Sequence, residues 1–267
     1  MFLSIITINR NNAKGLKRTI DSIALQTCRD FEHIIIDGAS LDGSVEVINE
    51  YAASTAGENL SYWISEPDSG IYNAMNKGIR KAKGNYCLFL NSGDSLYSND
   101  IIQKIFPYLK QNSPFICGKL KFDTGELIEI EENLSLTSFY RSLIPHQSIF
   151  IRRELFDAYG LYNESLKIIS DHVFFYITMV KNHVQYLRIN EIISLYDTNG
   201  ISSTEQKASI IEYESYFKKE LPADIFQLVK DNYYLKSQLR AIKSSLSYRI
   251  CFALLTPIKY IEQLRKK

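Results

Sequence analysis

The chain has 267 residues, an apolar fraction of 45% and a net charge of +1 at pH 7. This length suits one α/β domain with a smaller appendage, and the near-neutral charge argues against nucleic acid as a partner. The charge is unevenly distributed, because residues 230–267 hold nine basic and two acidic side chains. We therefore expect an acidic body followed by a basic tail.

The four cysteines stand far apart and form no CxxC pair. They indicate neither a zinc site nor a redox motif, and they suit a reducing compartment. The first residues show no signal-peptide pattern, and no run approaches the ~20 apolar residues that span a bilayer. We expect a cytoplasmic protein.

Short apolar runs alternate with helical patterns in the first half of the chain. Four runs predict buried strands, at residues 2–8, 31–36, 60–64 and 86–90. Three amphipathic segments predict helices between them, at residues 13–25, 43–52 and 71–83. Strands that alternate with helices of this length form βαβ units, so we expect a Rossmann-like, mostly parallel sheet with helices on both faces.

The rhythm changes after residue 94. A helix is predicted at 99–109, an antiparallel strand pair at 115–122 and 127–130, and a strand leading into a helix at 150–156. A helix capped by Ser170 at 170–180 and two short strands at 184–189 and 192–196 follow. We expect a main domain over 1–220, with halves 1–97 and 98–220, and a helical tail over 221–267.

Polar, glycine-containing loops follow each of the first four predicted strands. They contain Thr7 to Arg10, Asp37 to Gly43, Glu66 to Gly70 and Asn91 to Asp94. In open α/β sheets, ligands bind beyond the carboxyl ends of the strands. Because neither GxGxxG nor GxxxxGK[ST] occurs, the loops predict neither a dinucleotide fingerprint nor a P-loop.

The predicted sheet edge is acidic. Carboxylates accept a diphosphate only when a divalent cation bridges the two groups. Asp94 follows a buried strand among small residues and is the predicted metal ligand, with a turn-capping aspartate as the alternative. Asp37 is better suited to hydrogen bonding with a base or ribose.

Four segments together resemble the inverting family 2 glycosyltransferases of the GT-A fold, in particular bacterial enzymes of surface-polysaccharide assembly. The segments are Ser4–Asn11, Ile36–Gly43, Glu66–Gly78 and Phe89–Asp94, and Glu66–Gly78 is the most specific. The resemblance covers roughly residues 1–200. It implies a GT-A fold, a nucleotide-sugar donor for which a UDP-sugar is expected, and a divalent cation, Mn²⁺ or Mg²⁺.

The resemblance also implies where the donor binds. Thr7 and Asn9 would lie on the nucleotide floor, Asp37 would contact the base, and Asp68 would approach the base or ribose. Asn76 and Gly78 would shape the helix beneath the donor, and residues of the loops complete the set. The predicted nucleotide-sugar site consists of Thr7, Asn9, Arg10, Asp37, Ser40, Asp42, Asp68, Asn76, Gly78 and Asn91.

Asp94 matches the last acidic residue of the family's metal-binding motif. The sequence departs from the usual form, because the motif opens with Asn91 and carries Gly93 before Asp94. A single carboxylate therefore remains of the acidic cluster. We expect a metal held mainly by the donor diphosphate, with Asp94 and waters.

An inverting transfer needs a general base that takes the proton of the acceptor hydroxyl. Asp171 follows Ser170 at a predicted helix start, as in the family, and a helix N-terminus keeps a carboxylate ionised. Asp171 is the predicted base, with a simple first-turn cap as the alternative. His146 and Gln147 also match the family and are predicted on the acceptor side, with a structural histidine as the alternative.

Residues 246–267 combine apolar side chains with five basic ones. Such helices lie on membrane surfaces, and packing on the domain or on a second subunit is the alternative. The resemblance favours a peripheral position at the inner face of the membrane, with a glycan or polyprenyl-linked acceptor. The sequence thus predicts an inverting glycosyltransferase of polysaccharide biosynthesis. A non-catalytic nucleotide-sugar-binding module and a sugar nucleotidyltransferase are the alternatives.

Overall fold

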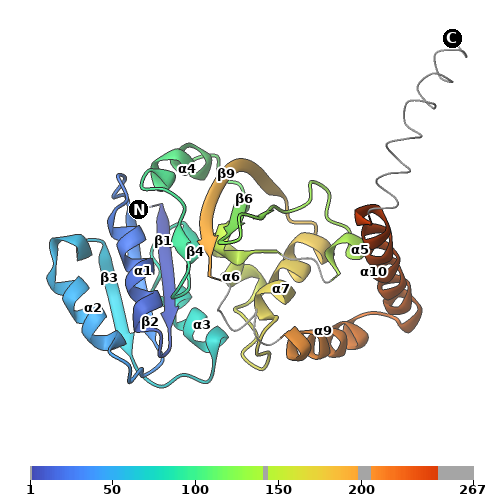
Figure 1. Ribbon diagram of the computed structural model, residues 1–267, viewed down its shortest axis with the longest axis horizontal. Helices are drawn as coiled ribbons and strands as arrows, with labels where there is room; N and C mark the ends of the chain where they lie inside the picture. Colours follow the sequence, from blue (N-terminus) through green and yellow to red (C-terminus); the bar gives the residue numbers. More distant parts are fainter. Residues whose placement is uncertain (1, 141–143, 198–205, 246–267) are drawn as a thin grey trace, which may run out of the picture. The chain divides into compact units, whose positions relative to one another are not determined.

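The computed structural model describes residues 2–140, 144–197 and 206–245 (Figure 1). The chain divides into two compact units. The first consists of residues 1–134 and 142–215, and the second of residues 135–141 and 216–267. Among the described residues, no helix is long and apolar enough to cross a bilayer. The first unit contains the sheet and every predicted site residue.

The βα alternation predicted for the first half is confirmed. The strands are β1 (Leu3–Asn9), β2 (Phe31–Asp37), β3 (Leu60–Ser65) and β4 (Tyr86–Phe89). The helices between them are α1 (Ala13–Ala24), α2 (Ser44–Ala53) and α3 (Ile71–Lys81). These four strands lie in the order β3-β2-β1-β4, and all three pairs are parallel.

The second half extends this sheet with shorter and mostly antiparallel pairings. Its strands are β5 (Ser95–Leu96), β6 (Phe115–Phe122), β7 (Leu127–Ile128), β8 (Ile149–Arg152) and β9 (Tyr186–Tyr196). Its helices in this unit are α4 (Ile101–Leu109), α6 (Glu154–Tyr159), α7 (Ser170–Phe175) and most of α9 (Gln206–Glu220), and a π-helical turn (Tyr176–Lys181) continues α7. The full order is β3-β2-β1-β4-β8-β6-β9-β5, with β7 on β6.

The prediction of two short strands at 184–189 and 192–196 is wrong, because β9 is one strand of 11 residues. Its polar stretch at Asn190 and Glu191 lies opposite a register shift in β6 near Gly118. A Cβ on Gly118 would approach the Ile193 side chain within 2.4 Å. The absence of a side chain there lets β9 pass close to β6 without a break.

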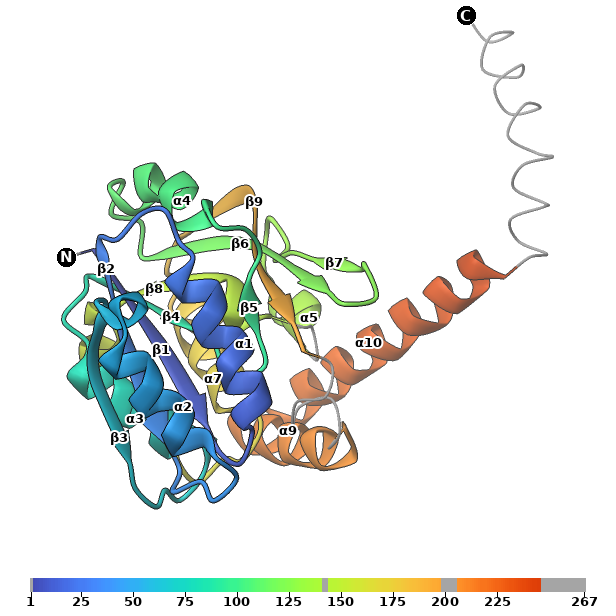
Figure 2. The same cartoon turned by 60° about the vertical axis from the view of Figure 1, so that its left-hand side comes forward.

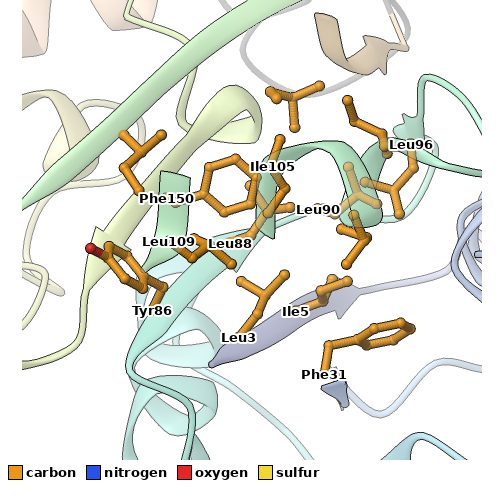
Figure 3. Close-up of a cluster of buried hydrophobic side chains, with 14 of the residues drawn as sticks. Leu3, Ile5, Phe31, Tyr86, Leu88, Leu90, Leu96, Ile105, Leu109 and Phe150 are labelled. Carbon is orange, nitrogen blue, oxygen red and sulfur yellow. The ribbon is translucent and has the colours of Figure 1, made fainter. Parts of the chain in front are cut away.

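An aliphatic core covers one face of the sheet. Leu3 and Ile5 of β1, Leu88 of β4 and Phe150 of β8 pack against Ile105 of α4 (Figure 3). Helices α1 and α2 lie together on this side of β1 to β3 (Figure 2). Burial of these large apolar side chains supplies the main driving force for this half of the fold.

Helix α3 covers the opposite face with a very close approach to β1. A Cβ on Gly78 would lie 2.4 Å from Cγ2 of Ile6, so only glycine permits this packing. Aromatic rings continue the layer toward α6 and α7. Tyr162 lies with its ring centroid 5.5 Å from those of Phe89 and Phe156 and 5.6 Å from that of Phe174. This layer supports the start of α7.

The described part of the second unit is helical. It contains α5 (Leu136–Phe139), the end of α9 (Gln206–Glu220) and the long helix α10 (Ala223–Ser244). The ring of Tyr140 lies about equally far from those of Phe217, Phe226 and Tyr233, at 5.9, 6.2 and 6.0 Å. The basic tail at 246–267, for which membrane binding is predicted, lies outside the described residues.

Candidate active site

The loops after the parallel strands meet at one edge of the sheet, as predicted. In the strand register, Asn9 at the end of β1 pairs with Asp37 at the end of β2, and Asp37 pairs with Ser65 at the end of β3. The segment after β4 follows the same line, since the Ser92 amide donates to the Ile8 carbonyl oxygen at 3.0 Å. Four sequence-distant loops therefore border one site.

Asp37 is the centre of a polar cluster at this edge. Its fully buried carboxylate accepts hydrogen bonds from Asn9 Nδ2 at 2.7 Å, Ser65 Oγ at 2.6 Å and both the amide and hydroxyl of Ser40. Burial opposes its ionisation, but these donors more than offset that effect and hold the pKa of Asp37 below its usual value. Asp37 organises this loop, and its contact with a base stays a prediction.

Arg10 and Asp68 converge on Gly38. Their side chains form an ion pair, with Arg10 Nη1 3.8 Å from Asp68 Oδ1, in which Arg10 is 65% exposed and Asp68 only 6%. A Cβ on Gly38 would meet Asp68 Oδ2 at 2.4 Å. Glycine is thus required for Asp68 to reach the end of β2. Both predicted residues lie at the expected edge, where Arg10 is open to a ligand.

Four other predicted residues have structural partners. Asp42 accepts the amides of Ala13 and Ser44, at 2.8 and 3.2 Å, and so caps the starts of α1 and α2. Thr7 is fully buried against His33, whose Nε2 lies 3.0 Å from the Thr7 hydroxyl. Asn76 and Gly78 lie in α3. The Asn76 side chain bonds the backbone of Tyr162 in both directions, at 2.8 and 3.0 Å.

The loop Asn91–Asp94 is fixed by α1. The Thr19 hydroxyl lies 2.6 Å from the carbonyl oxygen of Asp94 and accepts the Gly93 amide at 3.0 Å. Asn12 adds a hydrogen bond from Nδ2 to the Ser92 carbonyl oxygen at 3.0 Å. Sequence reasoning did not identify Thr19, because its position within an amphipathic helix gave no sign of this contact.

The Asp94 side chain is 4% exposed. Its Oδ1 accepts the Asp197 amide at 3.0 Å, and the Gln147 side chain is a second hydrogen-bond partner. Burial raises the pKa of Asp94 to about 6, although both hydrogen bonds favour the ionised form. The predicted donor-side residue Asp94 and the predicted acceptor-side residue Gln147 are therefore in contact.

Asp197, at the end of β9, brings a second carboxylate to this loop. A Cβ on Gly93 would lie 2.7 Å from Asp197 Oδ2, so Asp197 occupies the space beside the residue that departs from the family motif. Its carboxylate forms an ion pair with Arg18 of α1. Sequence reasoning missed both residues, because they lie 179 positions apart.

Asp171 lies in the first turn of α7 and has a hydrogen-bond partner at each carboxylate oxygen. Tyr72 Oη of α3 lies 2.7 Å from Asp171 Oδ1, and His146 Nδ1 lies 2.7 Å from Asp171 Oδ2. Burial opposes ionisation, but the hydrogen bond and charge of His146 and the hydroxyl of Tyr72 hold the pKa of Asp171 below its usual value. Asp171 is therefore an ionised and oriented carboxylate at neutral pH.

His146 connects the two halves of the site. Its Nε2 lies 3.3 Å from Asn91 Nδ2, while its Nδ1 contacts Asp171. His146 Nδ1 donates its proton to the Asp171 carboxylate. His146 thus links Asp171, the predicted base, to the loop that carries Asp94.

The start of α7 is held by a distant carboxylate rather than by its own cap. The prediction of Ser170 as N-cap is wrong, because Ile169 takes that position and the Ser170 hydroxyl has no partner among the described residues. Instead, Glu212 of α9 accepts the amides of Lys167 at 2.7 Å and Ile168 at 2.8 Å. This contact positions the turn that presents Asp171.

A divalent cation has partial support in the donor set. Among the described residues, no group of three His, Cys, Asp or Glu side chains is arranged to hold a metal ion. Mg²⁺, however, is usually bound through one or two carboxylates together with waters and substrate phosphates. Asp94 and Asp197 fit that requirement, because the Asp197 carboxylate lies beside Gly93 and the neighbouring Asp94 carboxylate accepts the Asp197 amide.

The comparisons with known proteins agree with this geometry. Residues 4–175 match the family described as "Glycosyl transferase family 2". The chain is 32% identical over 228 residues to a PGL/p-HBAD biosynthesis glycosyltransferase of Mycobacterium bovis BCG, and the match covers 82% of this chain and 83% of that protein. The sequence similarity therefore extends over nearly the whole length of both proteins.

Two solved structures share the fold. S. aureus TarS 1–349 in complex with UDP-GlcNAc has a TM-score of 0.64 at 14% identity, over 93% of this chain and 78% of that one. The mannosyltransferase PcManGT from Pyrobaculum calidifontis, in complex with GDP-Man and Mn²⁺, has a TM-score of 0.62 at 14% identity, over 99% and 82%. The predicted GT-A fold is confirmed, and the chain belongs to glycosyl transferase family 2.

Proposed function

We propose that this glycosyltransferase transfers a sugar with inversion from a nucleotide-sugar donor to a hydroxyl of a glycan or lipid-linked glycan in polysaccharide biosynthesis. One observation carries the proposal. Asp171 is partly buried, ionised and held by His146 and Tyr72, and His146 also contacts Asn91 in the loop that carries Asp94. A base and a donor-side loop are thereby joined in one hydrogen-bonded network.

In this reaction, a carboxylate oxygen of Asp171 takes the proton of the acceptor hydroxyl. The acceptor oxygen forms the new bond to the anomeric carbon from the face opposite the nucleotide, and the bond between that carbon and the diphosphate oxygen breaks. The nucleoside diphosphate leaves with the electron pair. His146 and Tyr72 fix the orientation of the carboxylate, which favours proton transfer from a bound acceptor.

Asp94 and Asp197 would hold a divalent cation together with the donor diphosphate. Such a cation, when bound, neutralises the charge that develops on the leaving group. Arg10, whose side chain is mostly exposed, is a further cation at the same edge of the sheet, where it can pair with a phosphate. Arg18 holds Asp197 in place before the donor binds.

A UDP-sugar is the donor that we propose, and the UDP-GlcNAc complex of TarS supports it. The name of the mycobacterial relative associates that protein with PGL/p-HBAD biosynthesis, which supports a role in glycan assembly. We place the reaction at the cytoplasmic face of the membrane, with the enzyme as a peripheral protein. Acceptors linked to polyprenyl lipid would be presented there.

The test is transfer from a panel of nucleotide-sugars to glycan-lipid acceptors with Mn²⁺ or Mg²⁺. The wild type and Asp171→Asn are compared, and thermal shift serves as the measure of donor binding. We expect transfer by the wild type, and in Asp171→Asn an unchanged donor-induced shift with a loss of at least about a hundredfold in turnover. Donor binding without any transfer by the wild type would support the non-catalytic alternative, and full activity of the variant would remove Asp171 from the mechanism.

A further inference from the structure

Helix α10 of the second unit has two apolar faces. One packs inside the unit through the buried side chains of Phe226 and Val229. The other carries four large apolar side chains that are about half exposed or more, namely Leu228 (60%), Leu235 (64%), Leu239 (49%) and Ile242 (55%). A stripe of this kind on a long helix marks an interaction surface.

The four residues of the stripe are spaced by seven, four and three positions, which suits positions a and d of a heptad. With Leu228 at position d of a heptad, the d positions are Leu228, Leu235 and Ile242, and the a positions are Ile225, Asn232 and Leu239. An apolar repeat of seven residues keeps its seam facing a partner helix when the two helices supercoil. Phe226 and Val229 fall at b and e, so the inner face and the seam are distinct.

We propose that α10 pairs with α10 of a second copy of this chain as a parallel, two-stranded coiled coil. The identity of the seam residues selects this partner. A single Asn at a fixes register and dimeric state. Asn232 takes that position in the middle of the seam.

Charges beside the seam favour the parallel orientation. In a parallel pair, position g of one helix faces position e of the next heptad on the other, which places Asp231 opposite Lys236 of the second copy. Because the dimer is symmetric, this pair of Asp231 and Lys236 occurs twice. In an antiparallel pair the e positions face each other, so Lys236 and Lys243 would meet one another. Opposite charges thus complement the parallel dimer and oppose the antiparallel one.

The measurement is the mass of the full chain by light scattering and sedimentation equilibrium at micromolar concentrations. We expect twice the 30.8 kDa of one chain. Leu235→Glu introduces two charges into the seam and should give a monomer of unchanged helicity. The matched control is Ser237→Glu, an exposed position away from the seam, which should remain dimeric.

A charge exchange tests the partner directly. Asp231→Lys and Lys236→Asp should each weaken the dimer by roughly tenfold, because two symmetric pairs are reversed, and the double variant should regain the wild-type constant. Oxidation of Leu228→Cys should crosslink two copies at this position, which only the parallel register allows. A monomeric wild type at every concentration, or single variants whose effects add in the double variant, overturns the proposal. Binding of a monomer to anionic vesicles through Leu235 would also overturn it, by assigning the stripe to a lipid surface.

Discussion

Asp171 receives its two hydrogen bonds from residues far away in the chain, 25 positions for His146 and 99 positions for Tyr72. The sequence predicted Asp171 and His146 separately, because each matched a short local pattern. It could not predict that they touch, since this contact depends on how the segment before β8 lies against α7. Tyr72 stood within the most specific motif, yet nothing local distinguished it from a core tyrosine.

Replacement of His146 tests whether this side chain lowers the pKa of Asp171. His146→Ala removes a hydrogen bond and a charge that keep the pKa of Asp171 low, so that pKa rises. Because the base acts in its ionised form, the acidic limb of the pH profile of kcat/KM should move to higher pH. We also expect turnover to fall on the order of ten- to a hundredfold from misplacement of the carboxylate.

His183→Asn is the matched control for this variant. His183 is an exposed histidine in a left-handed backbone conformation (φ 52°) that asparagine tolerates. Its pH profile should coincide with that of the wild type. An unchanged acidic limb in His146→Ala would show that His146 does not tune Asp171.

Asp94 should lower the stability of the ligand-free protein at neutral pH. Its folded-state pKa of about 6 lies above the ordinary value of 3.8, so ionisation of Asp94 lowers the free energy of unfolding. This loss is complete once the pH has risen above both values. The shift corresponds to on the order of 2–3 kcal/mol between pH 4 and pH 7. Asp94→Asn should therefore melt at a higher temperature than the wild type at pH 7.5, with a smaller difference at pH 4.5.

The same variant should lose the extra stabilisation that Mn²⁺ gives in the presence of a nucleoside diphosphate. Differential scanning calorimetry with and without the two ligands measures both effects. A lower melting temperature of the free variant at pH 7.5 would mean that the hydrogen bond from the Asp197 amide outweighs the cost of the buried charge.

At the scale of elements, local rules and tertiary contacts contribute differently. Periodicity predicted β1 to β4 and α1 to α3, because each of these helices buries one face and most of these strands are buried along their whole length. The insertion of β8 between β4 and β6 was not predictable, since strand order is set by packing between distant segments. The cap of α7 was mispredicted for the same reason, because Ile169 takes the N-cap position and Glu212 holds the segment that precedes it.

Glu212 therefore offers a test of whether the segment before α7 positions Asp171. Glu212→Ala leaves the amides of Lys167 and Ile168 without their acceptor, which should cost about 1–3 kcal/mol of unfolding free energy. Asp171 lies on the same turn, so kcat should fall while donor-induced stabilisation remains. Denaturant unfolding and steady-state kinetics measure the two effects. Glu212→Gln keeps one acceptor oxygen and should recover part of both, whereas equal losses in the two variants would contradict a role of this hydrogen bond.

At the scale of the whole molecule, two parts of the fold contribute residues to the site. The edge of the parallel strands provides the donor side, and α7 with the segment before β8 provides Asp171 and His146. The sequence predicted this edge from the position of the loops after the strands. It missed Asp197, because the second carboxylate comes from the far end of β9 and only the fold brings it to Gly93.

The carboxylates of Asp94 and Asp197 predict that cation and nucleotide stabilise the protein together. A ligand at a hundredfold its Kd adds about 2.7 kcal/mol of stability, which raises Tm by roughly 5–10 °C in a chain of this size. We expect UDP with Mn²⁺ to produce such a shift, and UDP alone or Mn²⁺ alone to produce much less, since few protein ligands hold the metal by themselves. Asp197→Ala should reduce the joint shift, while Asp21→Ala, an exposed carboxylate on α1, should leave it unchanged. An equal shift with UDP in the presence of a chelator would show that the diphosphate binds without a cation and would leave Arg10 as its main partner.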